Sequence, residues 1–168
     1  FLYFNNLGNP YFDNFWMFLS KTQANVIVYL LLLIAYIYSI NNKKRTKTLF
    51  RLIIAIAILI TISDQTSNLF KDSFQRLRPC YNELIADSLR LVKHSCGGRY
   101  GFFSAHASNS FSLAIFFGLL LRSSNRLLIL LFAIYAFLIS YSRIYLGVHY
   151  PIDILVGAIF GTVNAFVL

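Results

Sequence analysis

The chain is 168 residues long, and 58% of its residues are hydrophobic, 17% are aromatic and only 12% are charged. A soluble domain usually carries about 25% charged residues, so the composition excludes an ordinary water-soluble fold. Five spans of ~20 apolar residues with their connections use nearly the whole chain, which predicts one integral membrane domain over residues 1–168. The net charge of +9 does not indicate nucleic-acid binding, because no basic run is interleaved with aromatic residues or glycines.

The first predicted element is a short helix over residues 10–20. This segment is too short to cross a bilayer, and it mixes aromatic side chains with Asp13 and Asn14. Such a mixture is typical of an amphipathic helix that lies in the membrane interface, where Trp16 would anchor it.

Long apolar segments make up most of the rest of the chain. They lie at about 24–40, 49–70, 102–121, 127–142 and from 151 to the end. Each is interpreted as a membrane span. The predicted fold class is therefore all-α: a polytopic membrane bundle of about five transmembrane helices plus the interfacial N-terminal helix.

The charged residues separate by side of the membrane. The connections at 41–51 and 122–126 hold seven of the fifteen basic residues and no acidic residue. Basic loops stay in the cytoplasm, so the connections at 79–101 and 143–150 are expected to face outward together. Cys80 and Cys96 both lie in the first of these outer connections, where they would form a disulfide in an oxidising compartment and stay free thiols otherwise.

The end of the second span carries a row of polar residues. Asp64, Asn68, Lys71, Gln75 and Arg78 follow a 4, 3, 4, 3 spacing, which predicts one stripe on a helix with Lys71 and Arg78 ~10 Å apart. Charged groups at membrane depth are costly unless they line a wet cavity, so the stripe should face the bundle interior. Alternatively, these cations, with Arg76, are ordinary side chains that reach for the interface.

Two further clusters lie in the outer connections. Ser104 and His106 open the third span, where a hydroxyl, free backbone amides and an imidazole form a natural anion-binding corner. Arg143 precedes His149 by six residues, and Asp153 follows His149 by four, which brings the carboxylate within reach of the imidazole at a helix start. The alternatives are an isolated interfacial histidine in the first cluster and a purely structural His–Asp pair in the second.

The predicted topology brings these clusters to one membrane face. Lys71, Arg78 and Arg143 need an anionic partner, and Asp153 supplies only one negative charge. A phosphate matches this surplus, because guanidinium groups bind it bidentately and lysine binds it as a point charge. A divalent metal is not expected, since the surplus positive charge would repel it.

Three motifs resemble the signatures of the type 2 phosphatidic acid phosphatase superfamily, in the same order. They are Lys71-x6-Arg78-Pro79 (71–79), Phe103-Ser104-Ala105-His106 (103–106) and Ser142-Arg143-x5-His149-x3-Asp153 (142–153). With the spans around them, the resemblance covers nearly the whole chain. The second motif departs from the usual Pro-Ser-Gly-His, because Phe103 and Ala105 replace the proline and the glycine.

The resemblance implies a role for each matching residue. His149 would attack phosphorus, Asp153 would orient it, and His106 would protonate the leaving oxygen and later activate water. The residues implied to hold the phosphoryl oxygens are Lys71, Arg78, Ser104 and Arg143. No metal and no cofactor take part in this mechanism, and His94 matches no motif and is expected to be a loop residue.

The resemblance also implies a lipid substrate at the bacterial inner membrane, with the site facing the periplasm. Undecaprenyl pyrophosphate is the first expectation, and phosphatidylglycerol phosphate and the phosphates of lipid A are the alternatives. No nucleic acid and no obligate protein partner are expected. A vanadate-dependent haloperoxidase has a similar site but is soluble, and a non-enzymatic anion or lipid transporter or binding protein would carry charges across the whole membrane. Whether Asp64 serves the site or only helix packing stays open.

Overall fold

The computed structural model describes residues 1–93, 95–121 and 127–168, and the regular elements in these ranges are helices. In chain order they are α1 (Leu2–Asn6), α2 (Pro10–Leu19), α3 (Thr22–Ser39), α4 (Asn42–Phe74), the 3-10 turns η1 (Pro79–Tyr81) and η2 (Ala86–Ser88), α5 (Ala105–Leu121), α6 (Leu127–Tyr145) and α7 (Pro151–Val167). The segment 122–126 and His94, which were expected to be connections, lie outside the described residues.

The helices form a polytopic membrane bundle, as the sequence predicts. Three described helices, α3, α4 and α6, are long and apolar enough to cross a bilayer, and α5 and α7 are shorter apolar helices. Large apolar side chains such as Leu31 and Ile58 are exposed on the outside of the bundle, where lipid would cover them. The all-α membrane fold is confirmed, whereas the number of five spans stays a prediction.

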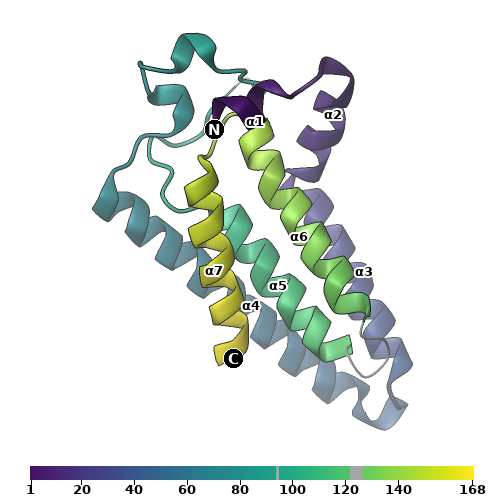
Figure 1. The fold of residues 1–168 in the computed structure, drawn as a ribbon. Helices are drawn as coiled ribbons and strands as arrows, with labels where there is room; N and C mark the ends of the chain where they lie inside the picture. Colours follow the sequence, from purple (N-terminus) through teal and green to yellow (C-terminus); the bar gives the residue numbers. More distant parts are fainter. Residues whose placement is uncertain (94, 122–126) are drawn as a thin grey trace.

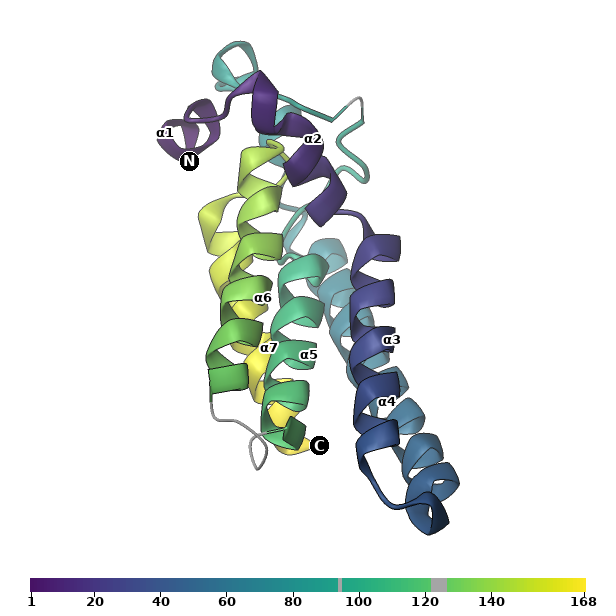
Figure 2. The same ribbon diagram turned by 90° about the vertical axis from the view of Figure 1, so that its right-hand side faces the viewer.

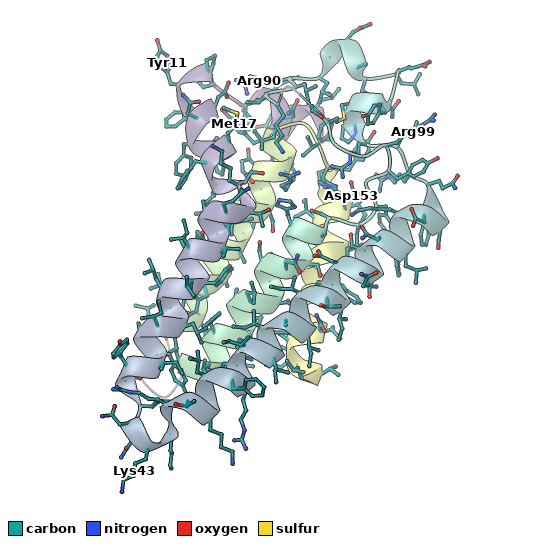
Figure 3. All side chains as sticks on the ribbon, turned by 180° about the vertical axis from the view of Figure 1, so that it is seen from behind. Tyr11, Met17, Lys43, Arg90, Arg99 and Asp153 are labelled. Atoms are coloured by element: carbon teal, nitrogen blue, oxygen red, sulfur yellow. A yellow bond between two sulfur atoms is a disulfide. The ribbon has the colours of Figure 1, made fainter. Side chains whose placement is uncertain are left out.

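The spanning helices form two groups. Figure 2 shows α5, α6 and α7 packed together on one side, and α3 and α4 joined as a hairpin on the other. The N-terminal helices α1 and α2 lie at one end of the bundle, together with the irregular connection from α4 to α5 (Figure 1). We call this the site end. Lys43 lies at the opposite end, far from Arg90 and Asp153 (Figure 3).

A buried polar cluster joins α4, α5 and α7 near the middle of the bundle. Ser108 donates to Ser63 at 3.0 Å, and the amide of Asn164 donates to the backbone oxygen of Leu59 at 3.0 Å and to Ser63 at 3.2 Å. Small residues let these helices approach closely: a Cβ on Gly157 would lie 2.6 Å from the backbone oxygen of Ser104. Such close contacts with interhelical hydrogen bonds hold membrane helices together where the hydrophobic effect does not. They fix the start of α5 against α7.

The second span differs from the prediction at both ends. The basic segment at 41–48 was expected to be a connection, but α4 begins at Asn42, and the Asn41 side chain accepts from the backbone N–H of Lys43 at 3.1 Å as a helix cap. At the other end α4 stops at Phe74, because Gln75 takes a left-handed conformation with φ of 47°. Arg78 is extended. The predicted continuous helical stripe through Arg78 is therefore wrong.

Two other boundaries shift. The fourth span continues to Tyr145, so Ser142 and Arg143 belong to the last turn of α6 rather than to the following connection. The expected interfacial helix is present as α2, with Asn9 capping it through the N–H of Tyr11 at 3.0 Å. The short helix α1 before it was not predicted.

Candidate active site

His149 lies in the tight turn between α6 and α7 and is almost fully buried, with 2% of its surface exposed. Gly147 has a positive φ of 78°, which a glycine adopts freely, and the turn brings the N–H of His149 to within 3.3 Å of the Arg143 carbonyl. Pro151 then begins α7. The sequence from Arg143 to Asp153 thus folds back on itself around the imidazole.

Asp153 holds one nitrogen of this imidazole. Its Oδ2 atom lies 3.4 Å from His149 Nδ1 and accepts from the backbone N–H of Tyr150 at 2.9 Å, as a cap of α7. The other ring nitrogen, Nε2, lies 3.3 Å from Nη1 of Arg78. A guanidinium can only donate, so Nε2 accepts, and the proton sits on Nδ1 facing the carboxylate. Nε2 is therefore the nitrogen with a free lone pair.

Burial lowers the pKa of His149 well below its usual value, and the neighbouring cations Arg143 and Arg78 add to the effect. The imidazole is consequently neutral at physiological pH. A neutral imidazole with its proton on the far nitrogen is the form that can act as a nucleophile.

Arg78 is placed by the connection rather than by α4. Its Nε atom donates to the carbonyl of Tyr100 at 3.3 Å, and its backbone N–H donates to the carbonyl of Arg99 at 3.1 Å. Gly101 leaves room for the side chain, since a Cβ there would lie 2.9 Å from Arg78 Cγ. Burial lowers the pKa of Arg78, although the Asp153 carboxylate opposes this.

Arg143 points from the last turn of α6 into the same region and is 4% exposed. Its Nη1 atom donates to the hydroxyl of Ser20, at the end of α2. Its Nε atom is buried and has no hydrogen-bond partner among the described residues. A buried donor of this kind usually finds a partner, so the arginine is prepared to receive an anion.

The residues from the other two motifs adjoin this cluster. Ser104 is fully buried, and its hydroxyl accepts from the N–H of Ala107 at 3.4 Å in the first turn of α5. His106 is half-buried in the same turn, within electrostatic range of Arg143. Lys71, in the last turn of α4, donates to Asn68 at 3.3 Å and acts electrostatically on His149. The structure thus brings the sequence-predicted residues to one end of the bundle.

Phe103, which stands where the family usually has proline, is fully buried. Its ring lies 5.2 Å from the ring of Phe70 on α4 and 5.2 Å from that of Phe160 on α7. The aromatic contacts therefore hold the segment before His106 by packing rather than by a proline.

Two cations near the site were not predicted. Arg76 donates to Asp153 Oδ1 at 3.2 Å, and its guanidinium lies 4.5 Å from the ring centre of Tyr150. Lys93 lies in the connection, and its pKa is lowered by burial and by the charges of Arg143 and Arg78. Arg76 was interpreted only as an interfacial residue, and a single lysine in a long connection carries no sequence signal at all.

A disulfide joins Cys80 and Cys96, whose Cα atoms are 6.4 Å apart. Cys96 is buried and packs in one cluster with Tyr145 and Val148. The connection is thus attached directly to the turn that carries His149.

Asp64 lies on α4, about two helical turns before Lys71. Its carboxylate accepts from the side chain of Asn109 at 2.9 Å, and both residues line a cavity of about 280 Å³ together with His106. Within the described ranges, no three His, Cys, Asp or Glu side chains gather closely enough to hold a metal ion.

Known proteins share both the sequence pattern and the fold. A family model described as the PAP2 superfamily matches residues 48–168. A lipid A 4'-phosphatase of Bacteroides thetaiotaomicron is 37% identical over 162 residues, which are 95% of this chain and 69% of the relative. A lipid A 4'-phosphatase of Porphyromonas gingivalis is 34% identical over 164 residues, 97% of this chain and 67% of the relative.

Two solved structures superpose on nearly the whole chain. The LpxE protein of Aquifex aeolicus has a TM-score of 0.70 and 22% identity, over 98% of this chain and 88% of that one. A transmembrane PAP2-type phosphatidylglycerolphosphate phosphatase from Bacillus subtilis has a TM-score of 0.73 and 14% identity, over 98% of this chain and 78% of that one. At these identities the two likenesses show the fold alone.

The family resemblance seen in the three motifs is confirmed by the family model and by the relatives. The predicted enzyme class, a phosphatase that hydrolyses phosphoric esters, is confirmed as well. The chain belongs to the PAP2 superfamily.

Proposed function

We propose that this phosphatase hydrolyses the 4'-phosphate of lipid A without a metal ion, through a covalent phosphohistidine at His149. One observation carries the proposal. The Nδ1 atom of His149 faces Asp153 at 3.4 Å, and Nε2 faces Arg78 at 3.3 Å inside a cationic site. A neutral, oriented imidazole beside donors for a phosphoryl group is the arrangement that nucleophilic phosphoryl transfer requires.

In the first step, Nε2 of His149 attacks phosphorus while the bond from phosphorus to the ester oxygen breaks. Arg78 turns its Nη1 from the imidazole to a phosphoryl oxygen, which frees the lone pair of Nε2. The imidazole gains positive charge as the new bond forms, and the Asp153 carboxylate stabilises it. The negative charge of the bound phosphate favours the protonated form of His106, which gives its proton to the leaving oxygen.

In the second step, water replaces the histidine. His106 is now neutral and takes a proton from a water molecule, whose oxygen attacks phosphorus. The bond from phosphorus to nitrogen breaks, inorganic phosphate leaves, and His149 returns to its neutral form. Lys71, Arg78 and Arg143 stabilise the charge on the phosphoryl oxygens in both steps, which commonly is the largest contribution to such catalysis.

Ser104 contributes through the start of α5. Its hydroxyl oxygen caps the N–H of Ala107 and can still donate its own proton to a phosphoryl oxygen. The positive end of the helix dipole points in the same direction.

The surroundings of the site support a lipid substrate. Three adjoining cavities along α3 and α4, of about 280, 330 and 480 Å³, run from His106 to Arg45 near the opposite end of the bundle, and α5 also lines the first two. Tyr29 lines the first two and Leu33 the last two. A largely apolar groove of this kind accommodates an acyl chain beside the phosphate site.

The relatives favour one of the three expected lipids. Both curated relatives are lipid A 4'-phosphatases, which supports the lipid A alternative over undecaprenyl pyrophosphate, the first expectation from the sequence. The proposal also places the site on the periplasmic side of a bacterial inner membrane. The basic stretch around Lys43 at the opposite end supports this orientation, and so does the disulfide, which persists in an oxidising compartment. Residues 1–168 are proposed to act as one domain.

The test is phosphate release from purified protein in detergent micelles with excess chelator. The substrates are lipid A, undecaprenyl pyrophosphate, phosphatidylglycerol phosphate and phosphatidic acid, each supplied to wild type and to His149→Ala. We expect release that survives chelation, is fastest with lipid A at the 4' position, and vanishes in His149→Ala. Release that requires a metal ion would overturn the mechanism, and a faster reaction with another lipid would overturn the substrate.

A trapping experiment tests the intermediate. His106→Ala lacks the group that activates water in the second step. The first step can still proceed with p-nitrophenyl phosphate, because nitrophenolate is a good leaving group that needs no proton from His106. This variant is expected to accumulate an acid-labile, alkali-stable phosphoryl adduct, which mass spectrometry would locate on His149. No adduct in this variant, with nitrophenol release in wild type, would exclude the covalent route.

A further inference from the structure

Residues 1–20, which we call the N-terminal segment, lie at the site end of the bundle (Figure 1). The family model begins only at residue 48 and so does not include them. A set of hydrogen bonds holds it there. Arg90 of the connection donates to both oxygens of Asp13 at 2.7 and 2.8 Å, and the hydroxyl of Tyr145 lies 2.8 Å from Asp13 Oδ1. The side chain of Asn5 donates to the backbone oxygens of Arg90 at 3.0 Å and of Ile144 at 3.1 Å. The segment is therefore part of the folded site end.

This segment contacts a proposed site residue through Ser20. This serine follows the last turn of α2, its backbone N–H donates to the carbonyl of Trp16 at 3.0 Å, and it is 4% exposed. Its hydroxyl accepts from Nη1 of Arg143, whose side chain is itself buried. A single buried residue of the N-terminal segment thus contacts a proposed site residue on α6.

Arg143 depends on this contact for its orientation. Its guanidinium has five N–H donors in a fixed plane, and the buried Nε has no partner among the described residues. The contact with Ser20 holds one corner of the plane. The remaining donors are then aimed at a bound phosphoryl group instead of rotating with the side chain.

We infer that Ser20 is a positioning residue of the phosphatase, which holds Arg143 through its hydroxyl. This inference rests on the proposed reaction. It assigns to the N-terminal segment a part in building the site, where the family motifs include only residues from Lys71 onward.

The test uses full-length protein in detergent micelles and the substrate that wild type hydrolyses fastest. Ser20→Ala removes the hydroxyl, and Ser20→Thr and Ser20→Val form a pair of equal shape that differ in the hydroxyl. A hydrogen bond to a charged group predicts that Ser20→Ala and Ser20→Val lose about tenfold to a hundredfold in kcat. We expect Ser20→Thr to stay within about threefold of wild type, and KM to change less than kcat in all three.

Two controls separate positioning from folding. Ser39→Ala changes an exposed serine, outside the site end, whose hydroxyl donates to the carbonyl of Tyr36 at 2.7 Å, and it should keep wild-type kcat. In the Arg143→Ala background, Ser20→Ala should cost no further activity, because residues that act as a unit are not additive.

Three outcomes would overturn the inference: unchanged kcat in Ser20→Val, an equal loss in Ser20→Thr and Ser20→Val, or a full additional loss in the Arg143→Ala background. Failure of the proposed function looks different, because wild type itself would then release no phosphate. In that case the binding of inorganic phosphate to wild type and to Ser20→Ala, measured by calorimetry, still tests the contact with Arg143. Equal affinity in the two proteins would overturn the inference.

Discussion

Arg76 and Asp153 form an ion pair at 3.2 Å, on the carboxylate oxygen opposite the one that faces His149. Asp153 is 1% exposed at its side chain and Arg76 is 38% exposed, so the arginine covers the buried carboxylate from the solvent side. The pair fixes the rotation of the carboxylate that orients the nucleophile.

Replacing Arg76 should lower the catalytic rate more than the stability of the fold. Arg76→Ala leaves Asp153 with Tyr150 and His149 as partners but free to rotate, so we expect kcat to fall about tenfold with little change in KM. Because Arg76 is partly solvent-exposed, the loss of stability should be small. Steady-state kinetics and thermal unfolding check both points. Arg99→Ala is the matched control, since its side chain is exposed in the same connection; a comparable loss there would contradict the specific role.

The protonation of His149 predicts a difference in acid stability. Its folded pKa lies below the unfolded value of 6.5 because of burial and the nearby cations, so the unfolded chain binds more protons in acid. The stability that comes from the neutral imidazole is fully present above about pH 6.5 and declines as the pH falls. Between pH 7.5 and 5.5, wild type should lose about 3 °C more in Tm than His149→Gln. Equal losses in the two proteins would mean that His149 titrates normally.

The close approach at Gly101 offers a steric test. A Cβ there would lie 2.9 Å from Arg78 Cγ and 3.6 Å from both Asp153 Oδ2 and His149 Nδ1. Gly101→Ala should displace Arg78 and reduce kcat by about tenfold, a loss typical of misplaced site groups. Gly98→Ala is the control, because nothing lies within 4 Å of its added Cβ. If both variants kept wild-type kcat, the packing around Arg78 would not limit the reaction.

Sequence reasoning succeeded where the relevant contacts are local. The four-residue spacing from His149 to Asp153 placed the carboxylate by the imidazole, because Tyr150 and Pro151 begin a regular helix. It failed at Arg78, where a left-handed Gln75 ends the helix that the spacing assumed. Non-glycine residues rarely adopt a left-handed conformation, so the sequence could not predict it at Gln75.

The topology predicted which clusters meet at one membrane face, but two individual side-chain contacts between distant parts of the chain could not be predicted. Arg76 meets Asp153 across 77 residues, and Ser20 meets Arg143 across 123. Neither partner has a local pattern that distinguishes it from an interfacial arginine or from a serine at a helix end. Only the packing of α2 against α6 and of α4 against α7 brings them together.

Asp64 provides the last test, because its carboxylate borders the cavity beside His106 and acts electrostatically on Lys71. Asp64→Asn preserves the shape of the side chain and can keep the 2.9 Å hydrogen bond with Asn109 through its amide oxygen. It removes one negative charge near a cationic site, so product phosphate should be held more tightly. We expect kcat to fall about fivefold and inhibition by inorganic phosphate to strengthen by a similar factor, with the folded protein recovered in normal yield.

The matched control for Asp64→Asn is Asp87→Asn, which removes the same charge from an exposed position in η2. Its turnover and its inhibition by phosphate should equal those of wild type, because solvent and salt screen the charge of an exposed carboxylate. If Asp64→Asn also behaved as wild type in both measurements, Asp64 would serve only the packing of α4 against α5 through Asn109. If instead kcat fell without stronger phosphate inhibition, the carboxylate would act on the chemical step, and the charge argument for product release would be wrong.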